Sequence, residues 1–372
     1  MTERLKQLLD SEAHDLAVPP PPTDSVLRQG RSFRRRNRMT AAGAGLAAAL
    51  VVGGSVVALT AGDDTDQGAN DAAAQPVGGN AVFSYGNQVF YDGPGHQAEI
   101  DDKAVKSMFY TSAGVVVRHG NNPNSDGGGP QRFSLITPAG EVQRLDLVTE
   151  ETVHASDVDQ PYIAYGEAVD GELQVVVYDV TANAEEARVT VGPTSEGWFP
   201  VSIDGDTVYV QNGYENAISE VDWKAGTVRP SESPSAWEVA DGRVSTEVGG
   251  HPTLVDASTG DVLLSVNKAG YLDLSPDGRY AQLVDEEGEM FEAGPASEME
   301  FEVFDVATGS SVTLSGPAFD WGWTADGDMF NVGEDEIVTC DSATGDCTSE
   351  PFNKPPAADA EDLKVGGRLY ES

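Results

Sequence analysis

The chain is poor in the side chains that enzymes use most often for metal, redox and nucleophilic chemistry. It has two cysteines and five histidines among 372 residues. No two histidines lie within four residues of each other, so the sequence contains no local metal-binding motif. A G-x-S-x-G turn, a phosphate-binding P-loop and an H-E-x-x-H helix are also absent. We therefore predict no catalytic residue, no metal site and no cofactor, and we expect the histidines to lie on the surfaces of strands or loops.

Basic residues are scarce and unevenly placed. Lysine and arginine number 22 against 62 aspartates and glutamates, which gives a formal net charge of -40. Such a field repels nucleic acid and anionic membrane surfaces, so nucleic acid is not an expected partner. Residues 1–38, however, carry eight basic and five acidic side chains, and residues 39–61 carry no charge. This asymmetry indicates that the two ends of the chain lie in different compartments.

One long uncharged segment separates the two ends. Met39–Ala61 is a run of 23 residues without a charged side chain, and about 20 apolar residues span a bilayer as a helix. The arginine-rich "RQGRSFRRRNR" precedes it, which places the N-terminus in the cytoplasm. We predict a single-pass transmembrane helix at 39–61, followed by a flexible linker at 62–80 and an extracytoplasmic domain. A cleaved secretory signal with its site at residues 72–74 is the alternative, and it also exports the C-terminal part.

Residues 1–38 are the predicted cytoplasmic tail. The stretch "LKQLLDSEAHDL" places its leucines near one face of a short helix, and "VPPPP" ends that helix as an extended segment. An isolated helix of this length is marginally stable in water. Two interpretations stay open. The tail is either disordered and only sets the topology, or it contains a docking helix for a cytoplasmic partner.

The exported part contains two repeated turn signatures. The first is Asp-Gly between β-prone runs, as in "VSIDGDTVYV", "WEVADGRVSTEV", "LDLSPDGRYAQLV" and "WGWTADGDMFNV". It predicts tight hairpins, because glycine adopts a positive φ without steric cost. The second signature is an apolar run, an aspartate and a turn of small residues, and its aspartates are Asp179, Asp222, Asp256, Asp305 and Asp341.

The two signatures alternate with a period near 40 residues, and two hairpins per period give four strands, which is typical of a β-propeller blade. We place blades at residues 106–147, 152–192, 197–231, 236–267, 270–316 and 319–350. Residues 81–105 supply three more strands, and the C-terminal "DLKVGGRLYES" is expected to add the strand that closes the ring. The predicted fold is therefore all-β, a propeller over residues 81–372 with seven four-stranded blades, or six as the alternative.

Two of these turns resemble those of known propeller families. "LSPDGRYA" resembles the Ser-Pro-Asp-Gly-(Arg/Lys) turn of TolB-type propellers of bacterial envelopes, and "FDVATG" resembles the Asp-x-x-Thr-Gly turn that WD40-like propellers share. The resemblance covers most of residues 81–372 and implies the fold. Most Trp-Asp pairs and Gly-His starts of true WD40 repeats are missing, so the likeness is architectural. The basic tail and its proline-rich break also resemble the N-terminal segments of actinobacterial single-pass membrane proteins.

The two cysteines flank the last turn of the second kind, in "VTCDSATGDCTSE". Strand pairing should bring Cys340 and Cys347 opposite each other, and disulfides persist in exported domains. A redox or metal-binding pair would instead favour C-x-x-C spacing or nearby histidines. We therefore predict a structural disulfide between Cys340 and Cys347.

A few polar and aromatic residues are candidates for a binding site. In "YLDLSPDGRYAQLV", Asp277-Gly278 is one copy of the repeated Asp-Gly hairpin turn. We interpret Arg279, which follows it, as having no fixed counterpart in the other copies. The repeat does not explain Asp273, which we place with Asp320 on inner strands that face the channel. Trp321 and Trp323 lie near the start of a blade, where they either ring one end of the channel or pack between blades.

The predicted function follows from fold and compartment. We expect a non-enzymatic binding, scaffold or sensing module that is embedded in the cell membrane and recognises a protein, peptide or glycan outside the cell. The alternative is a propeller hydrolase or lyase, which needs a convergent pair of carboxylates at the channel mouth.

Overall fold

A computed structural model of the chain describes residues 79–124, 127–213, 217–285, 299–355 and 363–368. The chain divides into two units, residues 1–37 and 38–372, and all described residues belong to the second. The predicted cytoplasmic tail, the predicted transmembrane segment and nearly all of the predicted linker lie outside the described residues. Within the described ranges, no helix has both the length and the apolar character needed to cross a membrane.

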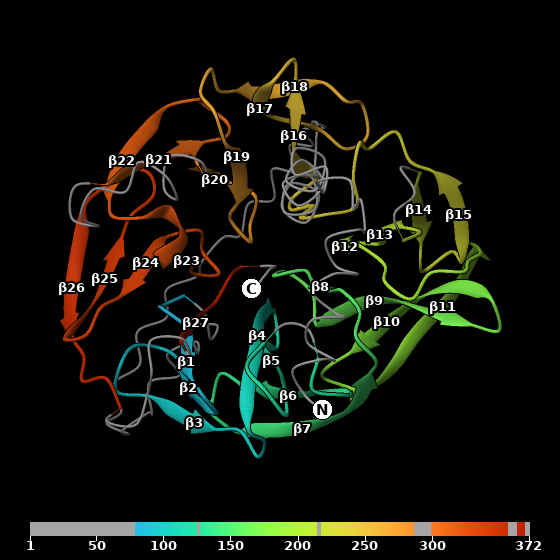
Figure 1. The fold of residues 1–372 in the computed structure, drawn as a ribbon, viewed down its shortest axis with the longest axis horizontal. Helices are drawn as coiled ribbons and strands as arrows, with labels where there is room; N and C mark the ends of the chain where they lie inside the picture. Colours follow the sequence, from blue (N-terminus) through green and yellow to red (C-terminus); the bar gives the residue numbers. More distant parts are fainter. Residues whose placement is uncertain (1–78, 125–126, 214–216, 286–298, 356–362, 369–372) are drawn as a thin grey trace, which may run out of the picture. The chain divides into compact units, whose positions relative to one another are not determined.

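The described residues form seven antiparallel sheets that follow one another around a central axis (Figure 1). The first sheet combines strands from both ends of the propeller, namely β1 (Phe83–Tyr85), β2 (Gln88–Phe90), β3 (Gln97–Glu99) and β27 (Leu363–Val365). The second contains β4 (Ala104–Thr111), β5 (Gly114–Gly120), β6 (Gln131–Ile136) and β7 (Val142–Thr149). The third contains β8 (His154–Ser156), β9 (Tyr162–Val169), β10 (Glu172–Asp179) and β11 (Ala184–Pro193).

The remaining four sheets complete the ring. The fourth contains β12 (Val201–Asp204), β13 (Thr207–Gln211), β14 (Ile218–Asp222) and β15 (Thr227–Pro230). The fifth contains β16 (Arg243–Val248), β17 (His251–Asp256) and β18 (Val262–Ser265). The sixth contains β19 (Tyr271–Leu274), β20 (Tyr280–Val284), β21 (Glu300–Asp305) and β22 (Ser311–Ser315). The seventh contains β23 (Trp321–Trp323), β24 (Met329–Val332), β25 (Glu336–Cys340) and β26 (Cys347–Pro351), preceded by the 3-10 helix η2 (Ala318–Asp320).

This architecture confirms the predicted all-β propeller with seven blades and excludes the six-bladed alternative. The fifth blade differs from the prediction because it has three strands in the described residues rather than four. The segment that precedes β16 forms a single bridge, between Ala240 and Arg243. Glu238 and Asp241 within this segment have φ values of 50° and 48°, and such left-handed residues interrupt an extended strand.

The last strand of the chain closes the ring, as the sequence indicated. β27 pairs antiparallel with β1, with Lys364 opposite Ser84. The backbone N–H of Gly366 then donates to the carbonyl of Val82 at 2.7 Å. Because β27 occupies the innermost position of the first blade, strands from the two ends of the propeller are held in one sheet, which closes the ring.

The hydrophobic core lies between neighbouring blades rather than inside any one of them. One buried cluster, for example, combines Val175 and Val177 of the third blade with Val201 and Val208 of the fourth. Trp237, which is 1% exposed and precedes the fifth blade, packs into the same cluster. Each sheet therefore packs both of its faces against neighbouring blades. This explains why the strands close to the axis carry apolar side chains on both faces.

Both turn signatures have the predicted role. The Asp-Gly glycines Gly205, Gly242, Gly278 and Gly327 have φ values of 58°, 60°, 69° and 85° at the turns that join the inner two segments of their blades. The aspartates of the second signature accept hydrogen bonds from backbone N–H groups of their own turns, as Asp341 does from Ala343 and Thr344 at 2.8 Å. The same arrangement occurs at Asp179, Asp222, Asp256 and Asp305.

The predicted disulfide is present. Cys340 of β25 lies directly opposite Cys347 of β26, and their sulfur atoms are 2.03 Å apart. The bridge therefore joins the two outer strands of the seventh blade across the last turn of the second kind.

Candidate functional site

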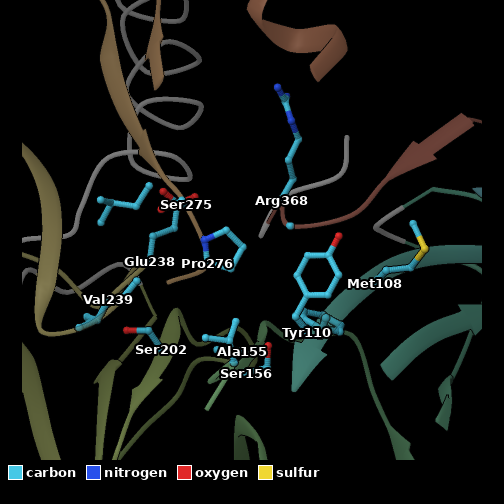
Figure 2. Close-up of a pocket in the computed structure, with 15 residues that line it drawn as sticks. Met108, Tyr110, Ala155, Ser156, Ser202, Glu238, Val239, Ser275, Pro276 and Arg368 are labelled. Atoms are coloured by element: carbon cyan, nitrogen blue, oxygen red, sulfur yellow. The ribbon is translucent and has the colours of Figure 1, made fainter. Parts of the chain in front are cut away.

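A pocket of about 530 Å³, counted with the part that opens to solvent, lies at one end of the central channel (Figure 2). Its walls come from the inner segments of five successive blades and from the chain after β27. Ser156 and Leu274 line it at the ends of β8 and β19, so it lies at the end of the channel where the Asp-Gly turns begin. We call it the channel-mouth pocket, and its lining residues are Met108, Phe109, Tyr110, Ala155, Ser156, Val158, Ser202, Glu238, Val239, Ala240, Leu274, Ser275, Pro276, Gly367 and Arg368.

The walls of the pocket are mostly apolar, with a small number of hydroxyl groups. Ser275 uses its hydroxyl within its own turn, where it donates to Asp277 at 2.6 Å and accepts from the N–H of Tyr280 at 3.0 Å. Ser202 is 2% exposed, and its Oγ has no hydrogen-bond partner among the described residues. A buried hydroxyl without a partner costs roughly 1–3 kcal/mol, so Ser202 marks a position where a ligand atom or water would be stabilised.

Glu238 is the one carboxylate among the described residues that line the pocket. It is 6% exposed, and its backbone has a φ of 50°, a conformation that non-glycine residues seldom adopt. Strained conformations of this kind cost about 1–3 kcal/mol and persist only where the surrounding structure enforces them. The fold therefore fixes an acidic side chain at the wall of the pocket.

Arg368 is the one basic lining residue in the described part of the chain. Its guanidinium donates to the carbonyl of Trp321 at 2.6 Å and to that of Ala318 at 2.5 Å. Figure 2 shows the side chain extending away from Glu238 and Ser202. Arg368 thus links the segment after β27 to the start of the seventh blade.

The Asp-Gly turns around the pocket are bonded from blade to blade. Asp157, after β8, accepts the N–H of Gly205 at 2.8 Å, and Asp204, at the end of β12, accepts the N–H of Gly242 at 2.7 Å. Burial raises the pKa of Asp204 to about 6, and the nearby charges of Asp157 and Asp241 add to the shift. The turns therefore place Asp157, Asp204 and Asp241 at this end of the channel, with Asp241 paired to Arg243 at 2.9 Å.

Arginine side chains continue this series of bonds, which corrects one sequence interpretation. Arg279 donates to the carbonyl of Asp326 in the next blade, and Arg243 donates to the carbonyl of Gly278 at 2.9 Å. Both follow an Asp-Gly pair directly, so Arg243 is the structural counterpart that Arg279 was expected to lack. The signal was present in the sequence as "ADGRV" beside "PDGRY".

The four residues singled out as site candidates do not line the channel-mouth pocket. Asp273 lies in β19, half-buried and opposite Gln282 of β20. Asp320 lies in η2 and is exposed, so its predicted place on an inner strand was wrong. Trp321 and Trp323 are 5% and 0% exposed and belong to the core cluster between the sixth and seventh blades. Both tryptophans thus pack between blades.

Sequence reasoning missed a buried network in the second blade. His119 contacts Asp102 through Nδ1 at 2.9 Å and Ser134 through Nε2 at 3.0 Å. Arg132 binds the same carboxylate at 2.6 and 2.8 Å. Burial lowers the pKa of His119 despite its bond to Asp102, so the neutral ring donates to Asp102 and accepts from Ser134.

The network resembles a catalytic triad in its connectivity, but its place in the fold argues for a structural role. His119 is 0% exposed and Ser134 is 3% exposed, and neither lines the channel-mouth pocket. The expectation that the histidines lie on surfaces is therefore wrong for His119, and also for His154, which is 2% exposed. Scattered positions in the sequence gave no sign of these contacts.

Comparisons with known proteins concern the fold. No family model and no curated protein matches the chain. Solved structures with a similar fold include apo AztD from Citrobacter koseri, with 13% identity and a TM-score of 0.43, covering 77% of this chain and 98% of that one. The dihydro-heme d1 dehydrogenase NirN in complex with DHE has 14% identity and a TM-score of 0.42, with coverages of 77% and 75%. TolB from Acinetobacter baumannii has 11% identity and a TM-score of 0.38, with coverages of 77% and 65%.

Proposed function

We propose that this protein is a binding module that holds part of a protein, peptide or glycan partner in the channel-mouth pocket. The observation that carries the proposal is the pocket itself, in which five blades surround a partly apolar space containing a buried hydroxyl, Ser202, with no partner among the described residues. Concave, mostly apolar sites with a few fixed polar groups are typical of ligand binding.

The chemistry of the lining favours binding over hydrolysis. A glycosidase mechanism uses two carboxyl groups that flank the scissile bond. Among the described residues that line the pocket, Glu238 alone has a carboxyl group. The buried Ser134, His119 and Asp102 lie in the second blade away from the pocket lining, so they offer no nucleophile to a ligand in the pocket.

We further propose that the module is displayed outside the cell on a single-pass anchor at residues 39–61, with a cytoplasmic tail that is available to a second partner. The change from a basic tail to an acidic propeller and the uncharged run between them support this topology. The Cys340–Cys347 disulfide also supports an extracytoplasmic propeller, because disulfides persist in oxidising compartments.

Site-specific photo-crosslinking tests the binding role. A photoreactive residue at Ser156, at the channel mouth, should crosslink a defined partner in intact cells. The same residue at Glu172, at the opposite end of the third blade, serves as the matched control and should not. Ala240→Trp, at a half-buried position of the lining, should fill the pocket and abolish the crosslink while leaving the melting temperature close to that of the wild type. Crosslinking that is equal at both positions, or unaffected by Ala240→Trp, would contradict the proposal.

Labelling with a membrane-impermeant maleimide tests the topology. In a variant without the native cysteines, a cysteine at the exposed Thr313 should be labelled in intact cells. A cysteine at Ser25 in the tail should be labelled only after the membrane is permeabilised. The reverse pattern would show that the predicted orientation is wrong.

A further inference from the structure

One outer strand of the propeller differs from the outer strands of the other blades in the side chains that it presents to solvent. Charged residues and prolines protect an exposed sheet edge from pairing with another chain. Five of the seven described outer strands carry such residues, which include Glu99 in β3, Arg144 in β7, Glu185 in β11, Pro230 in β15 and Glu350 in β26. The other two, β18 and β22, contain neither, and the exposed residues of β22 are serines and a threonine.

β18 exposes apolar side chains instead. Val262 is 57% exposed and Leu263 is 38% exposed. The pairing of β18 with β17 shifts register at Leu263, which has no residue opposite it. The extra residue interrupts the alternation of the strand, so two consecutive apolar side chains lie at the outer rim of the fifth blade (Figure 1). No strand in the described part of the chain pairs with this edge.

The charged residues that flank β18 favour a second copy of this chain as the partner. Asp261 precedes the strand and is exposed, and Lys268 follows it with a side chain that is 57% exposed. When two identical strands pair antiparallel across a two-fold axis, the start of each lies beside the end of the other. Each Asp261 is then near Lys268 of the second copy, which also contacts Glu302 of its own chain. A parallel arrangement would place like charges together.

We propose that two copies of the protein associate through the outer edges of their β18 strands, with Val262 and Leu263 of each copy in contact with those of the other. This surface lies away from the channel-mouth pocket, so the inference goes beyond the proposed binding function. β18 has four residues, and an edge of this length buries less than the roughly 1,200 Å² of a standard interface. A net charge of -40 on each copy also opposes association. The dimer is therefore weak and reversible.

Sedimentation velocity of the full chain, purified in a neutral detergent, measures this association. We expect a dimer whose fraction rises with protein concentration. The fraction should rise further when the salt concentration is increased from about 0.05 to 0.5 M, because salt screens the repulsion between the two acidic copies.

A substitution at the centre of the contact assigns the dimer to β18. Leu263→Lys introduces a charge at this edge, and its dissociation constant should rise at least about tenfold, because the change occurs in both copies. The melting temperature should stay close to that of the wild type, since Leu263 is exposed. Thr313→Lys is the matched control, at an exposed position of β22 in the sixth blade, and should leave the dimer unchanged. Both variants change the net charge equally, so general repulsion does not explain a difference between them.

An exchange of charges tests the antiparallel orientation. Asp261→Lys should weaken the dimer, because it places two basic side chains together. Adding Lys268→Asp to the same chain should restore the dimer, because opposite charges then face each other in exchanged positions. The melting temperature of each variant shows whether the propeller stays folded when the contact between Lys268 and Glu302 is lost.

The opposite results would overturn the inference. A full chain that stays monomeric at about 0.1 mM and high salt forms no such dimer. A dimer that persists in Leu263→Lys is held by another surface. If a photoreactive residue at Leu263 crosslinks a different protein in intact cells and no second copy, the edge binds that protein instead. Crosslinking at Ser156 is independent of all these results, so the proposed function is tested separately.

Discussion

The backbone N–H of Gly242 donates a 2.7 Å hydrogen bond to the carboxylate of Asp204, which belongs to the preceding blade. The bond shows what the repeated Asp-Gly turns do beyond reversing the chain. Each glycine either donates its backbone N–H to a neighbouring blade or allows that blade to approach closely. Asp157 accepts the N–H of Gly205 in the same way. The turns therefore hold adjacent blades together around the channel-mouth pocket.

The stability of the propeller should depend on the ionisation of Asp204. Its pKa is about 6 in the folded protein and close to 3.9 in an unfolded chain. The folded state therefore binds more protons between these values, and the free energy of unfolding falls as the pH rises from 4 to 6 and is then constant. We expect a contribution of about 2 kcal/mol from this residue, measured by urea denaturation across that pH range.

Asp204→Asn should remove this pH dependence and raise the stability at pH 7, because the amide keeps an oxygen that accepts from Gly242. Asp159→Asn, an exposed change near the neighbouring turn, is the control and should retain the wild-type slope. An Asp204→Asn variant that is less stable than the wild type at pH 7 would show that the charged carboxylate is the favourable form.

The buried network in the second blade should contribute through Asp102. Burial opposes ionisation of this carboxyl, but hydrogen bonds from Arg132, His119 and the Lys103 N–H outweigh it and hold its pKa well below the usual range. Its contribution is therefore present above about pH 4 and is lost as the pH falls further. Asp102→Asn should destabilise the protein by about 3 kcal/mol at pH 7, since one partner of a buried ion pair is removed.

Ser134→Ala provides the comparison for this prediction. It removes a single neutral hydrogen bond to His119 and should cost about 1 kcal/mol. Equal losses for the two variants, measured by chemical denaturation at the same pH, would mean that the charge on Asp102 has no special role.

The closing strand should tolerate no side chain at Gly366. A Cβ at this position would lie 2.5 Å from the hydroxyl of Tyr110 and 2.8 Å from the carbonyl of Val82. Tyr110 cannot move away freely, because its hydroxyl donates to the carbonyl of Trp323 at 2.8 Å. Gly366→Ala should therefore destabilise the propeller by about 2 kcal/mol. Gly197→Ala, where a Cβ meets nothing within 4 Å, should have little effect on the melting temperature.

The sequence predicted the parts of the structure that local patterns encode. Asp277-Gly278 is a turn because of its own backbone preferences, so comparing it with other units was enough to identify it. The same reasoning located the blades, the closing strand and the disulfide. It failed for contacts between distant segments. Nothing in the chain around Glu238 indicates that it lines the pocket, because its position follows from a left-handed backbone that interrupts the inner segment of the fifth blade. His119 meets Asp102 and Ser134 only because three segments of the second blade fold together.

The disulfide should stabilise the propeller without affecting the channel-mouth pocket. Cys340 and Cys347 join the outer two strands of the seventh blade, whereas the pocket is lined by inner segments of the second to sixth blades and by the chain after β27. Closing a loop of about eight residues contributes about 2.5 kcal/mol in the chain-entropy treatment. Replacing both cysteines with alanine should therefore lower the melting temperature by about 5 °C, measured by calorimetry.

The crosslink from a photoreactive residue at Ser156, measured well below the transition temperature, should be the same in the double variant and the wild type. Adding a reductant to the wild type should reproduce the effect of the double variant, because Cys347 is exposed to solvent. If removal of the disulfide weakens the crosslink at Ser156, the outer hairpin controls the pocket. The prediction that the outer strands only stabilise the propeller, while the inner segments bind the ligand, would then be wrong.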